Sequence, residues 1–201
     1  MKQRNASLKV NFIMNAILTL SSFLFPLITF PYISRILLPA GTGKVSFATS
    51  LVSYFAMLAQ LGIPTYGIRA CARVRDDRRE LTQTTHELLY INMIMCVVSY
   101  IIFFLVLGLV PRLREERLLY LIVSLTIAFN AMGMEWLYKA LEEYTYIAVR
   151  SIFFKLIALI AMFLMVHEKG DYVIYGGISI FASSASNILN FIHARRYIDG
   201  K

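Results

Sequence analysis

The chain has 201 residues, 58% of them hydrophobic, and carries a formal net charge of +8 at pH 7. Ordinary soluble domains are only about 45–50% apolar, and the mean hydropathy here is +0.64. This composition excludes an ordinary soluble domain and indicates an integral membrane protein. A membrane β-barrel is also excluded, because alternating polar and apolar segments of about ten residues are absent.

Six apolar runs follow one another along the chain, and short gaps between them hold most of the charge. A hydrocarbon layer about 30 Å thick requires roughly 20 mainly apolar helical residues. The predicted spans are residues 12–33, 45–63, 88–110, 118–137, 152–166 and 172–192. The fifth run is short, so we expect its helix to begin earlier, within residues 146–151. The sequence therefore predicts an all-α, polytopic membrane domain of six transmembrane helices over residues 1–201.

The first run follows three basic residues, Lys2, Arg4 and Lys9, as a secretory signal would. It is too long for the apolar core of a signal peptide and lacks a small-x-small cleavage site, so we expect it to remain as the first span. Pro26 and Pro31 lie inside it. Proline removes a backbone donor and clashes with the preceding turn, so a kink or break is predicted in the outer half of this helix.

Basic side chains are unequally distributed between the two sides of the predicted bundle. If the N-terminus is cytoplasmic, the outer gaps hold Arg35, Lys44, Arg112, Arg114, Arg117 and Lys169, and the other 14 of the 20 Lys and Arg residues lie inside. This bias follows the positive-inside rule and places both termini in the cytoplasm. The positive charge is therefore an orientation signal, with some attraction to anionic membrane lipids. It does not indicate a nucleic-acid partner.

Three of the predicted spans carry polar side chains at helical spacing, so each set falls on one side of its helix. The sets are Asn15, Thr19, Ser22 and Thr29 in the first span; Ser46, Ser50, Ser53 and Gln60 in the second; and Ser179, Ser183, Ser186, Asn187 and Asn190 in the sixth. Such a face either packs closely against another helix or lines an aqueous cavity. Both interpretations stay open for any one stripe, while the presence of three favours a shared polar cavity.

Few ionisable residues lie within or beside the spans. Lys155 lies early in the fifth, Glu135 near the inner end of the fourth, and Arg35 just after the first. Charged groups inside a membrane are costly and mark functional sites, unless the side chain reaches the nearest interface. Two alternatives follow. Either these side chains extend to the interface, or Arg35 and Lys155 bind an anionic headgroup with Glu135 as their partner or as a proton carrier.

Motifs for catalysis or metal binding are not apparent. The stretch Gly41–Lys44 shares glycines and a lysine with phosphate-binding loops but lacks their four-residue insert. Cys71 and Cys96 have no metal-ligand spacing. No Ser-His-Asp, Cys-His or paired-carboxylate arrangement indicates a nucleophilic or acid–base site. The sequence therefore predicts a protein that is not an enzyme and that uses no cofactor and no metal.

Five segments carry a resemblance to a known family. They are Phe25–Leu37 (FPLITFPYISRIL), Gly43–Ser50 (GKVSFATS), Leu61–Arg69 (LGIPTYGIR), Met134–Tyr144 (MEWLYKALEEY) and Ser186–Phe191 (SNILNF). In this order they resemble the Wzx-type flippases, the polysaccharide-biosynthesis branch of the multidrug/oligosaccharidyl-lipid/polysaccharide transporter superfamily. The resemblance implies transport of undecaprenyl-diphosphate-linked oligosaccharide, such as O-antigen units, across the bacterial inner membrane. It also implies a cationic cavity between two six-helix lobes, with ion coupling in some members.

The chain corresponds to the first lobe only, so the resemblance implies a partner: a second six-helix lobe or other membrane proteins of polysaccharide assembly. Under it, the headgroup candidates are Arg35, Arg69 and Lys155, and Glu135 is a candidate for proton or ion coupling. The candidates for the cavity wall are Asn15, Thr19, Ser22, Thr29, Ser46, Ser50, Ser53, Gln60 and Asn187.

Three other functions stay open at this stage. A drug or cation antiporter of the same superfamily would be expected to carry carboxylates in mid-span, and none is present here. A scaffold of a glycan-assembly complex would fit the single lobe. A membrane glycosyltransferase is disfavoured because no large loop with catalytic carboxylates is present.

Overall fold

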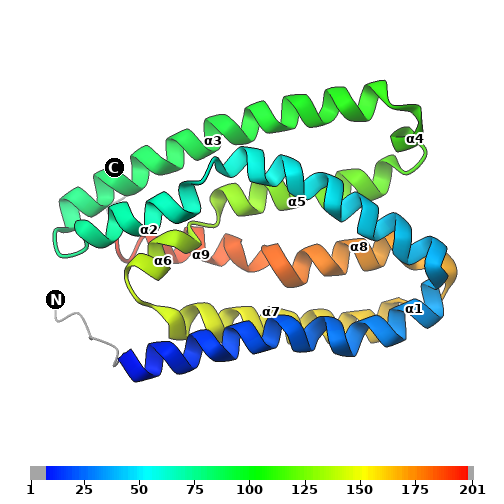
Figure 1. Cartoon of the computed structure of the whole chain (residues 1–201), viewed down its shortest axis with the longest axis horizontal. Helices are drawn as coiled ribbons and strands as arrows, with labels where there is room; N and C mark the ends of the chain where they lie inside the picture. Colours follow the sequence, from blue (N-terminus) through cyan, green and yellow to red (C-terminus); the bar gives the residue numbers. More distant parts are fainter. Residues whose placement is uncertain (1–7, 199–201) are drawn as a thin grey trace.

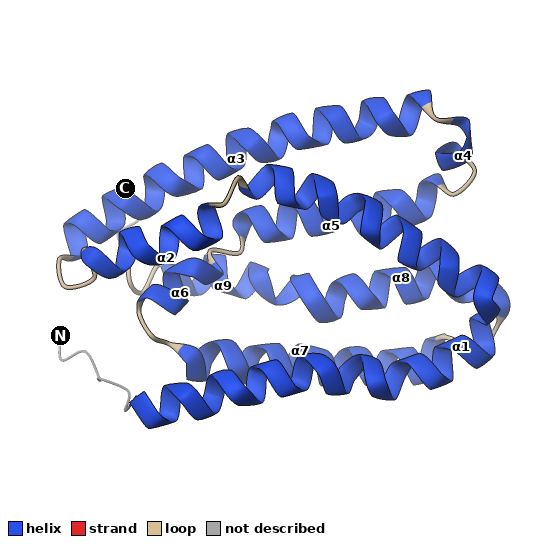
Figure 2. Cartoon of the chain, in the orientation of Figure 1, coloured by secondary structure: helices blue, strands red, loops and turns tan. Residues whose placement is uncertain are grey.

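The computed structural model describes residues 8–198, and this part of the chain contains helices and no strand (Figure 2). In chain order the elements are α1 (Leu8–Gln60), α2 (Ile63–Arg73), α3 (Arg78–Leu109), α4 (Pro111–Arg114), α5 (Arg117–Met132), α6 (Glu135–Ala140), α7 (Tyr144–Met165), the 3-10 turn η1 (Lys169–Asp171), α8 (Tyr172–Ile180), the π-helical turn η2 (Phe181–Ala185) and α9 (Ser186–Ala194). The all-α prediction is confirmed.

Helix α1 folds back on itself at Leu38, whose backbone is not helical (φ 57°, ψ 172°). The break separates an arm of residues 8–37 from an arm of residues 39–60, and the two run in opposite directions (Figure 1). The predicted break near Pro26 and Pro31 does not occur, because the first arm stays helical through both; the kink given as its alternative stays a prediction. Neighbouring helices can support proline inside a membrane helix. The chain turns instead just before Pro39, since proline disfavours helical geometry in the residue that precedes it.

Within residues 8–198, five helical segments are long and apolar enough to cross a membrane. The first of them, Lys9–Arg73, contains both arms of α1, so the predicted total of six spans is consistent with the fold. Helix α3 begins ten residues before the predicted span at 88, after Asp77 accepts hydrogen bonds from the backbone N–H groups of Arg79 and Glu80. Hydropathy marks the apolar core of a span, whereas capping groups such as Asp77 mark the start of the helix.

The fifth predicted span also begins too late, as expected from its short length: α7 starts at Tyr144 and has 22 residues. Arg150 and Lys155, which were assigned to the inner side, therefore lie within α7. The fourth and sixth spans are both interrupted. Gly133 and Met134 separate α5 from α6, and η2 separates α8 from α9.

Three clusters of buried apolar side chains hold the helices together. The 39–60 arm of α1 packs with α3, α5 and α8, and the 8–37 arm packs with α7. A third cluster joins α2, α3, α6 and α9. Outside these clusters the surface is unusually apolar: Phe12, Leu109 and Leu164 are 75%, 76% and 71% exposed. Contiguous apolar surface on this scale is avoided in water, so these side chains are expected to face lipid.

The bundle has two distinct ends (Figure 1). At the α4 end lie the break in α1, helix α4 and turn η1; at the α2–α6 end lie α2, α6 and the last turn of α9. Helix α1 starts and α9 finishes at the α2–α6 end. An even number of passes explains this arrangement. The side of the membrane on which each end lies stays a prediction, and Met1 and Lys201 fall outside the described residues.

Candidate functional site

Both arms of α1 expose polar side chains in a bundle whose surface is otherwise largely apolar. Asn15, Thr19 and Ser22 are exposed on the 8–37 arm, as are Ser46, Ser50 and Ser53 on the 39–60 arm. The hydroxyls of Thr19, Ser22 and Ser53 donate to backbone carbonyls of their own helix at 2.9, 3.0 and 2.7 Å. Because their hydrogens are already used, these oxygens face outward as acceptors. Lipid offers no donor, so this face suits water, a polar ligand or another helix.

Lys155 meets the polar face of the first arm near the middle of α7. Its ammonium nitrogen donates to the hydroxyls of Ser21 and Ser22 at 3.1 and 2.9 Å. Lys155 is half-buried, and it lies too far from either end of α7 to be explained simply as an interface residue. The structure thus brings together Ser22 and Lys155, which the sequence nominated for different roles.

The other headgroup candidates are not gathered into one basic cluster. Arg35 is exposed near the α4 end, next to the break in α1, and Arg69 is exposed on α2 at the opposite end. Lys155, in the middle of α7, lies between Arg35 and Arg69 along the long axis of the bundle. Thr29 does not share the exposure of its stripe, since it is buried and its hydroxyl lies 3.4 Å from the carbonyl oxygen of Pro26.

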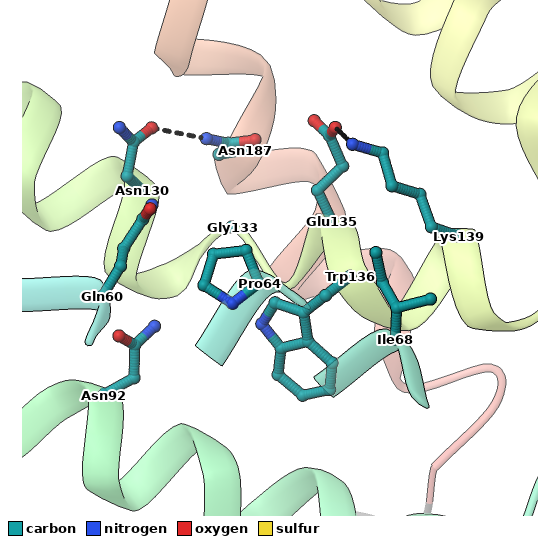
Figure 3. A pocket seen from close by; sticks show the side chains of 10 residues that line it. All are labelled: Gln60, Pro64, Ile68, Asn92, Asn130, Gly133, Glu135, Trp136, Lys139 and Asn187. Carbon is teal, nitrogen blue, oxygen red and sulfur yellow. Dashed lines mark hydrogen bonds and ion pairs between the residues drawn. The ribbon is translucent and has the colours of Figure 1, made fainter. Parts of the chain in front are cut away.

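A cavity of about 190 Å³ lies at the α2–α6 end (Figure 3). Its lining residues are Gln60, Pro64, Ile68, Asn92, Asn130, Gly133, Glu135, Trp136, Lys139 and Asn187. Three of them were nominated from the sequence on separate grounds: Gln60 and Asn187 as cavity wall, and Glu135 as a coupling group. The fold brings these three predicted residues to one place.

Three interruptions of helices converge on this cavity. Leu61 and Gly62 have positive φ (42° and 74°) between α1 and α2, and Met134 has φ 41° between α5 and α6. The π-helical turn η2 ends two residues before Asn187. Broken helices leave backbone groups unpaired, and membranes tolerate them only where protein or a polar cavity satisfies these groups. Such breaks are a common feature of substrate sites in transporters.

Two asparagines pair with carbonyls of the broken backbone around the cavity, and a third pairs with another asparagine side chain. The side-chain amide of Asn92 donates to the carbonyl of Ala131 at 2.8 Å, and that of Asn190 to the carbonyl of Gly133 at 2.6 Å. Asn187 donates to the side-chain oxygen of Asn130 at 3.1 Å. Asn92 and Asn130 were missed in the sequence. Each is the only amide side chain in its apolar run, and this was the available signal. The sequence was searched only for repeated polar stripes.

Glu135 is ion-paired to two basic residues at the edge of the cavity. One carboxylate oxygen lies 2.8 Å from the Lys139 nitrogen, and the other lies 3.5 Å from the guanidinium of Arg150. The Arg150 side chain is only 5% exposed and lies over the ring of Tyr146, 5.6 Å from its centroid. Arg150 was also missed, because the sequence placed it in a connection. Glu135 therefore bridges the two cations, one through each of its carboxylate oxygens.

Comparison with known proteins gives one family and two relatives. The model of a family described as "Polysaccharide biosynthesis protein" matches residues 8–200. A protein of Escherichia coli (strain K12) named "Putative O-antigen transporter" is 24% identical over 189 residues, which are 94% of this chain and 46% of that protein. A protein of Shigella dysenteriae with the same name is 26% identical over 157 residues, covering 76% of this chain and 38% of that protein.

The chain therefore spans less than half the length of these two curated relatives. No solved structure matches it.

Proposed function

Because the chain belongs to the polysaccharide biosynthesis protein family, we propose that it is one lobe of a transporter that moves a lipid-linked polysaccharide precursor across the bacterial inner membrane. The observation that carries this proposal is the polar face on both arms of α1, with the ammonium group of Lys155 held against it in mid-helix. The name shared by the two relatives, which refers to O-antigen transport, supports the same substrate class.

In this proposal the substrate is a glycan on undecaprenyl diphosphate, and its lipid tail stays in the bilayer. Moving a diphosphate through a membrane is costly unless cations and hydrogen-bonding groups replace its water. Arg35, Lys155 and Arg69 offer positive charge at the α4 end, the middle and the α2–α6 end. Since a headgroup in transit needs partners at successive depths, their separation suits this role better than one tight cluster would.

The acceptors on α1 would face the hydroxyl groups of the sugars. This surface accepts hydrogen bonds without carrying charge. It consists of the serine hydroxyl oxygens of Ser22, Ser46, Ser50 and Ser53 and the side-chain amide of Asn15. Neutral groups of this kind replace water around a sugar without binding it so tightly that release is slow.

A second six-helix lobe is the proposed partner, and it would cover the polar face of α1. We place the α2–α6 end and both termini in the cytoplasm, which follows from the excess of basic residues on that side. Removing Arg150 and Lys155 from the inner side leaves this bias in the same direction. Contacts with membrane lipids would then be made by the exposed apolar side chains.

Glu135 is the proposed coupling group. Exchange of its carboxylate between Lys139 and Arg150, or its protonation, would release one of these cations and change the packing of α6 against α7. A Glu135→Gln variant should then lower transport while leaving the protein folded. Unchanged transport in that variant would remove Glu135 from the mechanism.

A chimaera tests the proposed function. The part of the Escherichia coli relative that matches this chain is replaced by it, and O-antigen export is measured in a strain that lacks the relative. We expect export from the chimaera. Stable insertion without export would favour a scaffold in a glycan-assembly complex over a transporter.

Lys155 provides the sharpest variants of this chimaera. Lys155→Met should lower export roughly tenfold or more, because a charge-assisted hydrogen bond contributes about 1.5–3 kcal/mol. Lys155→Arg keeps the charge and should retain most of the activity. Lys169→Met, which removes an exposed lysine at the α4 end, is the matched control and should have no effect.

A further inference from the structure

We propose that the cavity at the α2–α6 end is a binding site for a single neutral sugar ring. This inference rests on the proposed function, since it assigns one ring of the transported glycan to a defined place in the lobe. It goes further by naming the residues that hold the ring: Gln60, Asn92, Trp136 and the Asn130–Asn187 pair.

Two residues that line the cavity each have a buried polar atom without a hydrogen-bond partner: one atom is an acceptor and the other a donor. The side-chain oxygen of Asn92 and the indole nitrogen of Trp136 make no hydrogen bond within the described part of the chain. Their residues are only 2% and 5% exposed. Leaving such groups unpaired costs about 1–3 kcal/mol each. A ligand that donates to Asn92 and accepts from Trp136 would remove this cost.

The positions of these two groups fit one small ligand. In the view of Figure 3, the nitrogen edge of the Trp136 ring faces the side of the cavity where Asn92 and Gln60 lie. Helix α2 fixes the ring: a Cβ atom on Gly67 would lie 2.9 Å from two of the indole carbons. Trp136 is thus held in one orientation by close contact with the α2 backbone, and its buried N–H has no hydrogen-bond partner among the described residues.

The charges around the cavity favour a neutral ligand over an ion. The ammonium group of Lys139 and the N–H of Trp136 oppose a bare cation, and the carboxylate of Glu135 opposes an anion. A hydroxyl group can both donate to Asn92 and accept from Trp136. Side-chain amides, of which the wall has four in Gln60, Asn92, Asn130 and Asn187, pair equally well with hydroxyl groups and with the N-acetyl groups of amino sugars.

The volume leaves two candidates for the occupant. Liquid water takes about 30 Å³ per molecule, so a cavity of about 190 Å³ accepts either a few waters or one sugar ring. A sugar presents several hydroxyl groups on a rigid frame, so it loses less entropy on binding than the same number of separate waters. The experiment therefore has to separate a sugar from water alone.

Trp136 is the only tryptophan of the chain, so its fluorescence reports on this cavity directly. The full 201-residue chain in lipid nanodiscs is titrated with glucose, galactose, mannose, rhamnose, N-acetylglucosamine and N-acetylgalactosamine. At least one of these sugars should produce a saturable change in Trp136 emission at millimolar concentration. Sodium chloride and inorganic pyrophosphate are titrated in parallel and should produce none.

Two variants separate binding from folding. Gln60→Leu removes a wall amide that makes no hydrogen bond to other described residues, and it should weaken the sugar response at least tenfold with unchanged helical content. Asn92→Leu should abolish the response, but it also removes the cap on Ala131, so it is interpreted only if circular dichroism shows a folded protein. Met57→Ala, at an exposed position on the same arm as Gln60, is the control and should respond as the unmodified chain does.

The outcomes decide the inference separately from the proposed function. A response to sodium but to no sugar would show a cation site, and no saturable response to any probe would show a cavity filled by water alone; either result overturns the inference. Export by the chimaera without a sugar response would refute this site and leave the transport function standing. A sugar response without export by the chimaera would support this site and refute the transport function.

Discussion

Gly133 allows Asn187 to reach Asn130 across the junction between α5 and α9. A Cβ atom at position 133 would lie 2.6 Å from the amide carbon of Asn187 and 2.8 Å from its nitrogen. Both distances are far shorter than a normal contact, so any side chain at this position must displace Asn187. Small residues at helix contacts serve this purpose in membrane proteins.

A Gly133→Ala variant should therefore break the hydrogen bond between Asn187 and Asn130 and destabilise the bundle by about 1–3 kcal/mol, the usual cost of overpacking. Thermal unfolding followed by circular dichroism in detergent measures this cost. Gly108→Ala is the control, because no atom lies within 4 Å of its added Cβ. Alanine has the higher helix propensity, so Gly108→Ala should not destabilise the protein. An equal loss in both variants would show that displacement of Asn187 is not the cause.

At the scale of single residues, the sequence predicted chemical type better than location. Lys155 was nominated as an unusual charge, but its predicted depth was wrong because the polar first turns of α7 hid the true start of the helix. Gln60, Glu135 and Asn187 were nominated from three different spans, and nothing in their spacing could show that they meet. Arg150 could not be found, because its burial depends on the position of Tyr146 and Glu135 in the fold.

At the scale of elements, the turn of α1 depends on a strained residue. Leu38 adopts a conformation (φ 57°, ψ 172°) that is nearly restricted to glycine. The strain is maintained because the 8–37 arm is fixed by α7 and the 39–60 arm by α3 and α5. The position of the break was not predictable from proline content, since α1 contains three prolines and turns only before the last.

Replacing Leu38 with glycine should relieve this strain and stabilise the protein by about 1 kcal/mol. The same substitution at Leu27, an exposed position inside the helical arm, should instead destabilise it by about 1 kcal/mol. Thermal midpoints of the two variants measure the difference. A lower midpoint for Leu38→Gly would show that the native backbone at the turn is not strained.

Glu116 joins two helices at the α4 end: it accepts hydrogen bonds from Lys44 of α1 and from Tyr172 of α8. Burial by itself would raise the pKa of Glu116, but these two hydrogen bonds outweigh it and leave the pKa below its usual value. A lowered carboxyl pKa means that this contact stabilises the fold above the pKa of the unfolded chain, about 4.3. The stabilisation is lost as the pH falls through the lower pKa of the folded state.

The thermal midpoint should therefore fall as the pH is lowered from 5 to 3, about one unit on either side of that unfolded-state pKa, and the fall should be smaller in Glu116→Gln. At pH 7 the same variant should have a lower midpoint than the unmodified chain, since the ion pair to Lys44 is gone. Glu115→Gln, which changes an exposed neighbour, is the control. An identical pH dependence in all three proteins would contradict the role of Glu116.

At the scale of the whole molecule, the sequence was sufficient for the all-α membrane fold. Apolar runs reveal spans directly because a bilayer allows few alternatives to helices. The interruptions after Gln60, after Met132 and before Ser186 were not predicted, since each lies in a run that was assigned to a single span from its overall hydropathy. They nevertheless form the cavity, so hydropathy alone could not locate the part of the lobe that we propose binds sugar.

In the proposed transporter, the polar face of α1 borders an aqueous path, while the faces beside it border lipid. Two pairs of adjacent, exposed residues allow a matched comparison: Ser22 with Phe23, and Ser53 with Tyr54. The natural cysteines Cys71 and Cys96 are buried. They therefore provide a background of low reactivity, because a thiol reacts as the thiolate, which forms in water and not in an apolar environment.

Each of the four residues is replaced by cysteine in the two-lobed chimaera, and labelling by a charged, membrane-impermeant thiol reagent is measured in intact membranes. Ser22→Cys and Ser53→Cys should react at least tenfold faster than Phe23→Cys and Tyr54→Cys, a ratio that corresponds to about 1.4 kcal/mol. Equal rates within both pairs would show that the polar face of α1 does not border an aqueous path.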